Sequence, residues 1–401
     1  TSTVFSGHNI ICENSQIVAE SQPFTTGYAQ AQVDLGFIGN ERSRMCHVQQ
    51  GGYLTVEFSL SDDAEPTRVY DPSPFVPTDK EQSDIRCERA LAILSNGLAR
   101  RIKHVNAQTL VIGVSGGTDS SLALLTAVRA LKILGRPASD IISVTMPCFG
   151  TTERTLNNSI ALATVLGTTV RKIDITKSVT QHLADIGHDI AVTDTTYENA
   201  QARERTQVLM DIANKTNGLV LGTGDMSELA LGWATFNGDQ MSMYGVNAGV
   251  PKTLVRALLR YEAARLGGET RRVLLDVIDT PVSPELLPPD QSGAIRQVTE
   301  DLVGPYELHD YFLFMMIRKG FAPSKIYALA RLSFAGVYTD EEIYKWLRKF
   351  VWRFFTQQFK RSCSPDSVRL GSVDLSKYGH RMPSDACCDT WLADLDEYVK
   401  E

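Results

Sequence analysis

The stretch Val111-Ile-Gly-Val-Ser-Gly-Gly-Thr-Asp-Ser120 runs from the pattern of a buried strand into a short Ser/Gly loop, and a helical pattern begins directly after it. A loop in this position exposes backbone N–H groups at the positive end of a helix, so it can bind an anion. Gly116 and Gly117 allow phosphate oxygens to approach the backbone. Asp119 repels phosphate, and beside a polyphosphate we therefore expect it to hold a divalent cation. The competing interpretation is an ordinary turn between a strand and a helix.

Apolar runs and helical periodicity alternate along the chain from Thr109 onward. This alternation predicts an α/β protein with a doubly wound parallel sheet, in which ligands bind beyond the carboxyl ends of the strands. The strands are expected at 109–114, 141–146, 169–175 and 218–222, and the helices at 120–134, 155–166, 177–187, 198–215 and 251–266.

The regions on either side of this alternation have other patterns. Residues 1–62 show short β segments separated by turns, too few to form an independent core. We expect a linker rich in Asp, Pro and Ser over 63–82, and one large domain with a helical C-terminal extension over 83–401. The individual β segments are expected at 9–12, 16–19, 28–34 and 53–58, and the additional helices at 83–105, 308–318, 323–332 and 339–359.

The composition limits the class of protein. With 401 residues, of which 43% are hydrophobic and 22% charged, the chain resembles a globular protein with room for two or more domains. A net charge of −7 argues against a surface that coats nucleic acid. The chain has no run of 18 apolar residues and no signal-peptide pattern, so we expect no membrane span. Seven cysteines without a C-x-x-C pair favour a reducing, cytoplasmic compartment.

A second Gly-rich segment, Gly222-Thr-Gly-Asp-Met-Ser-Glu228, follows the strand expected at 218–222. The carboxyl ends of parallel strands meet at one edge of a sheet, so Glu228 is expected near Asp119. Two carboxylates from different strands, completed by phosphate and water, are a common Mg²⁺ site. The alternative is that Glu228 is only a first-turn acid favoured by the helix dipole.

The next segment is a loop that contains two aromatic residues, Leu231-Gly-Trp-Ala-Thr-Phe-Asn-Gly-Asp239. Its aromatic rings suit stacking against a flat heterocycle, although loop aromatics more often pack into the core. The preceding helix carries Asn199, Arg203 and Arg205, and arginine can clamp phosphate with two hydrogen bonds. The alternative for this helix is a solvated polar face.

Short motifs occur in an order that resembles one enzyme family. The first loop is shorter than G-x-x-x-x-G-K-[ST] and lacks its lysine, but resembles the S-G-G-x-D-S loop of the ATP pyrophosphatases. From about residue 82 onward the chain is similar to glutamine-dependent NAD⁺ synthetases. Besides the two Gly-rich segments, the motifs are Tyr197-Glu-Asn-Ala-Gln-Ala-Arg203, Gly238-Asp-Gln240, Val250-Pro-Lys252, Ser283-Pro-Glu-Leu286, Gly304-Pro305, Phe321-Ala-Pro-Ser-Lys325 and Phe359-Lys-Arg-Ser362.

The opening segment from Phe5 to Arg42 resembles the last strands of a nitrilase-type glutaminase domain. The resemblance implies that the chain corresponds to the C-terminal part of a longer two-domain enzyme. The glutaminase Glu, Lys and Cys would then lie upstream of residue 1, so no glutaminase catalytic residue is expected here. Cys12 lies in an apolar strand and is expected to serve packing.

Members of this family amidate nicotinic acid adenine dinucleotide (deamido-NAD). The nicotinate carboxylate attacks the α phosphorus of ATP, pyrophosphate leaves, and ammonia then displaces AMP to give NAD⁺. The resemblance therefore implies ATP as co-substrate, Mg²⁺ as cofactor, and ammonia that the full-length enzyme obtains from glutamine. It also implies a homodimer or higher homo-oligomer, with no nucleic-acid or membrane partner.

The family's site residues can be assigned to matching positions of this sequence. Asp119 and Glu228 match metal ligands, whereas Met243 stands where short ammonia-using relatives have an Asp. The positions that match ATP contacts are Gly113, Val114, Ser115, Gly116, Gly117, Thr118, Asp119, Ser120, Thr223, Lys252 and Thr280. Those that match deamido-NAD contacts are Asn199, Arg203, Glu228, Trp233, Ala234, Thr235, Phe236 and Lys360.

Two other functions remain open at this point. Another amidating ATP pyrophosphatase, such as GMP synthetase, would keep the first loop but not the segments at 222–228 and 359–362. A non-catalytic nucleotide-binding module would need neither Asp119 nor Glu228. The aromatic-rich helix over 344–355 can serve either a dimer interface or the core.

Overall fold

Strand β3 (Thr109–Gly113) lies at the centre of a parallel sheet with the order β5-β4-β3-β6-β7. The structure is a computed structural model, and it describes residues 6–45, 56–57, 68–280, 286–287 and 299–400. The strand order reverses at β3, because β4 follows it on one side and β6 on the other. Such a switch point is where open α/β sheets bind ligands. The other strands are β4 (Ile141–Thr145), β5 (Thr169–Lys172), β6 (Gly218–Gly222) and β7 (Tyr244–Gly245).

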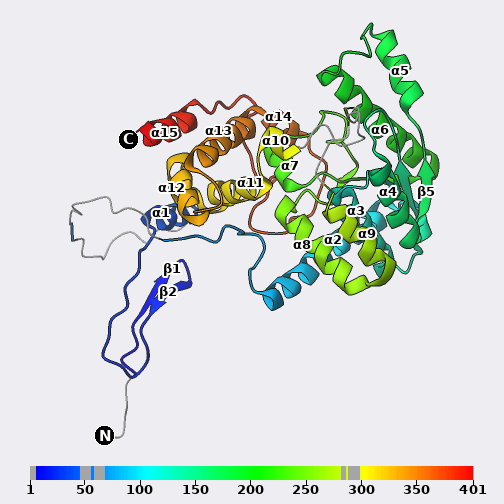
Figure 1. The fold of residues 1–401 in the computed structure, drawn as a ribbon. Helices are drawn as coiled ribbons and strands as arrows, with labels where there is room; N and C mark the ends of the chain where they lie inside the picture. Colours follow the sequence, from blue (N-terminus) through cyan, green and yellow to red (C-terminus); the bar gives the residue numbers. More distant parts are fainter. Residues whose placement is uncertain (1–5, 46–55, 58–67, 281–285, 288–298, 401) are drawn as a thin grey trace.

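Helices cover both faces of this sheet (Figure 1). Leu110 and Ile112 of β3 pack into a core with α2, α3, α4, α8 and α9, whereas Val111 packs on the opposite face with α5 and α6. Successive strand residues point to opposite faces, so the strand is buried on both sides, as in a doubly wound sheet. These helices are α2 (Lys80–Val105), α3 (Thr118–Ile133), α4 (Glu153–Val165), α5 (Thr176–Asp185), α6 (Thr195–Thr216), α8 (Lys252–Leu266) and α9 (Gly268–Ile278), with a 3-10 turn η1 (Ala138–Asp140).

A helical region with its own aromatic core lies beside the sheet (Figure 1). Helix α13 buries Trp346, Phe350 and Phe354 in that core, so it is a core helix. Helix α11 continues into a π-helical segment, η2, which had been expected as ordinary helix. The elements of this region are α7 (Met226–Leu231), α10 (Thr299–Val303), α11 (Tyr306–Leu313), η2 (Phe314–Lys319), α12 (Pro323–Ser333), α13 (Asp340–Thr356), α14 (Gln358–Ser362) and α15 (Asp389–Lys400).

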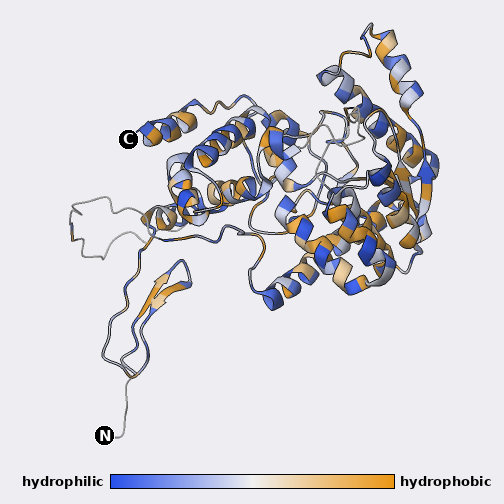
Figure 2. Ribbon diagram, in the orientation of Figure 1, coloured by the Kyte–Doolittle hydropathy of each residue, from blue (hydrophilic) through white to orange (hydrophobic). Residues whose placement is uncertain are grey.

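The N-terminal segment forms an antiparallel hairpin of β1 (Ile10–Glu13) and β2 (Gln16–Glu20), as expected from the sequence. Its residues Ile10 and Ile17 are exposed, and so is Cys12, which had been expected to serve packing. The hairpin stands apart from the helical region (Figure 2). Helix α1 (Leu35–Ser43) follows and packs Phe37 edge-on against Phe321.

The strand expected at 28–34 is absent, and these residues have no regular structure. The segment pairs with no strand in the described part of the chain, and Asp34 instead caps α1 by accepting a hydrogen bond from the Phe37 N–H at 2.8 Å. Strand β5 is also shorter than expected, because its four residues are all exposed at the sheet edge. The elements that were not predicted are α1, η1, α9, α10, α14, α15 and β7, and α14 includes residues that were expected to form a loop after 359. The strand expected at 53–58 lies almost entirely outside the described residues.

Across the described ranges, no helix combines the length and apolarity that a membrane crossing requires.

Candidate active site

A cleft of about 590 Å³ opens at the carboxyl ends of β3 and β6. It is the place at which the strand order predicts a ligand. Of the residues expected to bind ATP or deamido-NAD, it is lined by Gly113, Val114, Ser115, Gly117, Thr118, Asp119, Ser120, Asn199, Thr223, Glu228, Trp233, Ala234, Thr235, Thr280 and Lys360.

The loop between β3 and α3 has the backbone of an anion site. Helix α3 begins at Thr118, and its N-cap residue Gly117 supplies no side-chain cap, so the first N–H groups of the helix face the cleft without a capping side chain. Gly116 has φ +87°, and a Cβ placed there would lie 2.2 Å from the Thr155 carbonyl oxygen. Only glycine fits this turn, because any side chain would collide with the start of α4.

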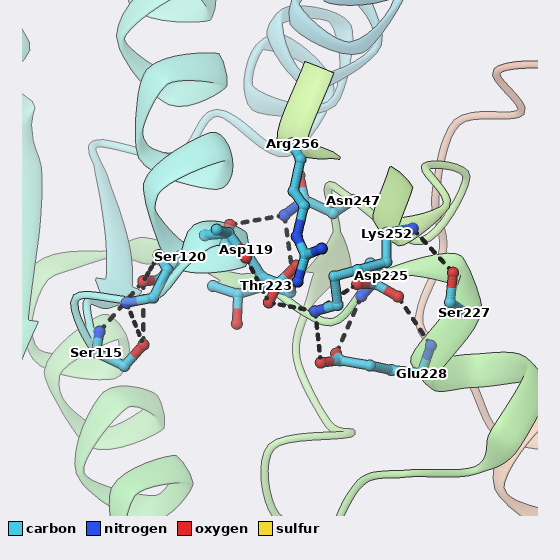
Figure 3. Close-up of polar contacts among 12 residues, drawn as sticks. Ser115, Asp119, Ser120, Thr223, Asp225, Ser227, Glu228, Asn247, Lys252 and Arg256 are labelled. Carbon is cyan, nitrogen blue, oxygen red and sulfur yellow. Dashed lines mark hydrogen bonds and ion pairs between the residues drawn. The ribbon is translucent and has the colours of Figure 1, made fainter. Parts of the chain in front are cut away.

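A cluster of one cation and three carboxylates lies at the base of the cleft (Figure 3). The Nζ atom of Lys252 lies 2.7 Å from Oδ2 of Asp119 and 2.7 Å from Oδ2 of Asp225. It also lies 3.0 Å from Oε1 of Glu228. Lys252 and Asp225 are fully buried, whereas the side chains of Asp119 and Glu228 are about one-fifth exposed toward the cleft.

The charges of this cluster depend on one another. Burial raises the pKa of Glu228 to about 7 and that of Asp225 well above its ordinary value, because an ionised carboxyl loses hydration, while the ammonium of Lys252 opposes both shifts. Burial alone would lower the pKa of Lys252, but the three carboxylates hold it well above its ordinary value. The lysine therefore stays charged.

Helix α7 sets the positions of two of these carboxylates. The Asp225 side chain accepts from the Glu228 N–H at 2.8 Å, and Oε2 of Glu228 accepts from the Asp225 N–H at 3.3 Å. This reciprocal pair is a capping box, which satisfies the free N–H groups at the start of the helix. Asp225 had no predicted role, although its spacing of three from Glu228 is the sequence signal of such a box.

Asn247 joins the two Gly-rich loops. Its side-chain amide donates to the backbone carbonyl of Asp119 at 2.8 Å and to that of Thr223 at 3.0 Å. Asn247 is fully buried, so this link is protected from water. Sequence reasoning missed this residue because its partners are more than 20 positions away in the chain.

The loop that follows α7 forms another wall of the cleft. The ammonium of Lys360 donates to the carbonyls of Gly232 at 2.8 Å and Ala234 at 2.7 Å. Arg353 donates to the Leu231 carbonyl at 2.7 Å, and its guanidinium lies 5.2 Å from the centre of the Trp233 ring. Cations at the carbonyl end of a short helix stabilise it.

Four expected site residues do not line the cleft: Gly116, Lys252, Arg203 and Phe236. Gly116 shapes the loop and Lys252 lies beneath the carboxylates. The exposed Arg203 donates to the Phe236 carbonyl at 3.3 Å, and the Phe236 ring packs 5.5 Å from that of Phe359. Asn199 accepts from the Thr235 hydroxyl at 2.7 Å, which links α6 to the aromatic loop.

Known proteins match both the sequence and the fold. The family model for NAD synthase matches residues 90–349. The glutamine-dependent NAD(+) synthetase of Mycobacterium tuberculosis is 38% identical over 439 residues, covering 100% of this chain and 64% of that protein. The synthetase of Mycobacterium leprae is 38% identical over 445 residues, covering 100% of this chain and 65% of that protein. The chain therefore spans a little under two thirds of these relatives.

A crystal structure supports the same fold. The glutamine-dependent NAD(+) synthetase of Cytophaga hutchinsonii superimposes with a TM-score of 0.64 at 19% identity, over 78% of this chain and 56% of that one. At this identity the likeness concerns the fold alone, and it confirms the α/β architecture expected from the alternating pattern. The match over residues 90–349 covers more than half of the sequence, so the chain belongs to the NAD synthase family.

Proposed function

We propose that this chain catalyses the ATP-dependent amidation of deamido-NAD to NAD⁺. The nicotinate carboxylate attacks the α phosphorus of ATP, and pyrophosphate leaves with the electron pair of the broken P–O bond. Ammonia then attacks the carbonyl carbon of the adenylate, loses a proton, and AMP departs. The substrate carboxylate is itself the nucleophile, so the protein needs no Ser-His-Asp or Cys-His set.

The observation that carries this proposal is the cleft in which the Ser/Gly loop faces the Asp119–Asp225–Glu228–Lys252 cluster. Transfer of an adenylyl group places negative charge on the leaving pyrophosphate. Preorganised N–H groups at the start of α3 supply opposite partial charge, and a divalent cation held by the carboxylates would add to it. Such preorganised charge is the main way in which a site of this kind lowers a barrier.

The residues fit a divalent cation. Asp119, Asp225 and Glu228 each offer a carboxylate oxygen within 4.8 Å of the others, and Oδ1 of Asp119 is buried without a hydrogen-bond partner. Hard oxygen ligands of this kind suit Mg²⁺, for which we propose Asp119 and Glu228 as ligands. When bound, the metal would neutralise phosphate charge. Lys252 supplies positive charge at the same cluster.

The other wall of the cleft suits the dinucleotide. Asn199, Trp233, Ala234, Thr235 and Lys360 line it, and we propose that they contact deamido-NAD. Arg203 and Phe236 lie just outside the cleft, where the Arg203 guanidinium donates to the Phe236 carbonyl. We propose that these two residues shape this wall or contact the substrate at its rim.

We propose that residues 1–62 belong to a nitrilase-type glutaminase domain, that 63–82 link it to the synthetase, and that 83–401 form the synthetase domain. Similarity over the full chain to relatives named as glutamine-dependent supports this division. Ammonia then reaches the cleft from glutamine only when that upstream domain is present. We also propose a homo-oligomer, following the family.

The test is the formation of NAD⁺ and AMP from ATP, Mg²⁺ and deamido-NAD, with ammonium chloride in one assay and glutamine in the other. We expect turnover with ammonium only. Asp119→Asn should lower the rate by roughly 10²–10³-fold, whereas Asp211→Asn on the exposed face of α6 should not change it.

Two negative results of this assay would have different meanings. Exchange of pyrophosphate into ATP that depends on deamido-NAD, without NAD⁺, would mean that adenylation occurs and ammonia transfer does not. If neither AMP nor pyrophosphate forms with any acceptor, the chain is a nucleotide-binding module and the proposal is wrong.

A further inference from the structure

We propose that Asp310 is a positioning residue for the cluster of Lys252 and the three carboxylates. It lies on α11 in the helical region, lines no part of the cleft, and has no role in the chemistry described above. This inference rests on the proposed function, because it concerns the geometry of the same site.

The Asp310 carboxylate joins α7 to α8. Its Oδ1 accepts a short hydrogen bond from the Ser227 hydroxyl. Its Oδ2 accepts from the Thr253 N–H at 2.9 Å and from the Thr253 hydroxyl at 2.6 Å. The Ser227 Oγ in turn accepts from the Lys252 N–H at 2.8 Å (Figure 3). The described hydrogen bonds of the Asp310 side chain therefore all go to the first turns of these two helices.

Helix α8 needs this contact because it lacks a cap of its own. Its N-cap residue is Pro251, which supplies no side-chain hydrogen bond. An α-helix leaves its first four N–H groups without an internal partner, and buried N–H groups left unpaired are costly. Ser227 and Asp310 pair with the first two, those of Lys252 and Thr253. The negative charge of Asp310 also lies favourably at the positive end of the helix.

The contacts of Asp310 are one residue away from the cluster on both helices. Ser227 directly precedes Glu228, and Thr253 directly follows Lys252. A shift of either helix start would move one carboxylate or the ammonium, whose mutual distances are 2.7–3.0 Å. Asp310 and Ser227 are each only 1% exposed, so neither can touch a substrate in the cleft. Their effect on catalysis must pass through Glu228 and Lys252.

Three variants of the full chain test this role. Asp310→Ala removes all the acceptors and should lower kcat by roughly 10–100-fold, the usual cost of losing a group that orients site ligands. Asp310→Asn should restore most of kcat, because its oxygen can accept from Thr253 while its NH₂ donates to Ser227. The control is His309→Ala, at the buried neighbour on the same helix, whose Nε2 donates to the Val303 carbonyl in the one hydrogen bond described for this side chain. It should lower the melting temperature but not kcat at permissive temperature.

A double-mutant cycle separates positioning from general stability. If Asp310 acts through Lys252, the loss caused by Asp310→Ala should nearly vanish in a Lys252→Met background. An equal loss in both backgrounds, or an equal fall in kcat for His309→Ala, would overturn the proposal.

Hydrogen exchange of the amides of Lys252 and Thr253 provides a readout without turnover. Their exchange should be faster in Asp310→Ala than in His309→Ala, and unchanged exchange would refute the role of Asp310. If the wild-type chain makes no AMP, the proposed function fails on its own, while the exchange result still decides whether Asp310 holds the start of α8.

Discussion

The ammonium of Lys252 lies 2.7 Å from the carboxylate of Asp119, although the two residues are 133 positions apart in the sequence. Lys252 is the first residue of α8, and Asp119 lies in the first turn of α3, directly after the Ser/Gly loop. Their contact brings a buried cation next to the Ser/Gly loop that precedes α3. Asp225 and Glu228 share the same ammonium, so in this cluster one cation faces three carboxylates.

Removing that cation should destabilise the protein. Lys252→Met leaves three carboxylates together without a counter-charge, and breaking a buried pair in this way typically costs about 3–5 kcal/mol. We expect a lower melting temperature and a larger recovery on addition of Mg²⁺ than in the wild type. Differential scanning calorimetry with and without Mg²⁺ measures both. Lys345→Met, on an exposed position of α13, is the control, and a melting temperature as high as that of the control would contradict the assigned charge balance.

The conformation of Gly116 should matter more for activity than that of Gly135, which also has positive φ. Gly116→Ala and Gly135→Ala both place a side chain at positive φ, +87° and +66°, at a cost of roughly 1–2 kcal/mol each. Only at Gly116 does the new Cβ meet an atom, the Thr155 carbonyl oxygen at 2.2 Å, so only there must the loop move. We expect Gly116→Ala to lower kcat/KM for ATP by roughly 100-fold. Equal activity of the two variants would show that the loop does not bind the nucleotide.

Much of the site could be predicted from the sequence, because the alternating pattern predicts a parallel sheet. Asp119 and Glu228 each follow a buried apolar run, and parallel strands place their carboxyl ends on one edge. The same argument placed Thr223 at this edge, whereas Trp233 and Phe236 were assigned to the site from the resemblance.

The parts that could not be predicted depend on contacts between distant segments. Lys252 was expected at the phosphates from a resemblance, but its burial beneath three carboxylates depends on how α8 packs on α7. Asp310 and Asn247 lie in segments that contain no recognisable site motif. Their hydrogen-bond partners come from distant segments, so only the folded chain shows which elements they join. Helix α9 begins at Gly268 without a side-chain cap, so local sequence signals its start poorly.

The pH dependence of stability should show the buried state of His309. Burial lowers the pKa of His309 to about 4 from its ordinary value of 6.5, against the opposing effect of its hydrogen bond to the Val303 carbonyl. As the pH falls from 6.5 toward 4, the unfolded chain takes up a proton that the folded chain does not, so stability is lost. Between pH 7 and 4.5 this loss should be about 2–3 kcal/mol.

The variant His309→Leu cannot lose stability in this way. The difference in free energy of unfolding between wild type and variant should therefore shrink by that amount over the same interval, measured by chemical denaturation at both pH values. His182→Leu, at an exposed position of α5, controls for the loss of an imidazole. A constant difference between wild type and His309→Leu would mean that His309 is accessible to protons in the folded state.

Lys360 should affect the dinucleotide and not ATP. Its ammonium holds the carbonyls of Gly232 and Ala234, and the loop that these residues begin carries Trp233 and Thr235 on the wall assigned to deamido-NAD. Lys360→Ala removes two hydrogen bonds from a charged donor, each worth about 1.5–3 kcal/mol. We expect the KM for deamido-NAD to rise by at least tenfold while the KM for ATP changes less than twofold, whereas Lys345→Ala should change neither. A rise confined to the KM for ATP would place the loop after α7 on the nucleotide side of the cleft and reverse the two walls.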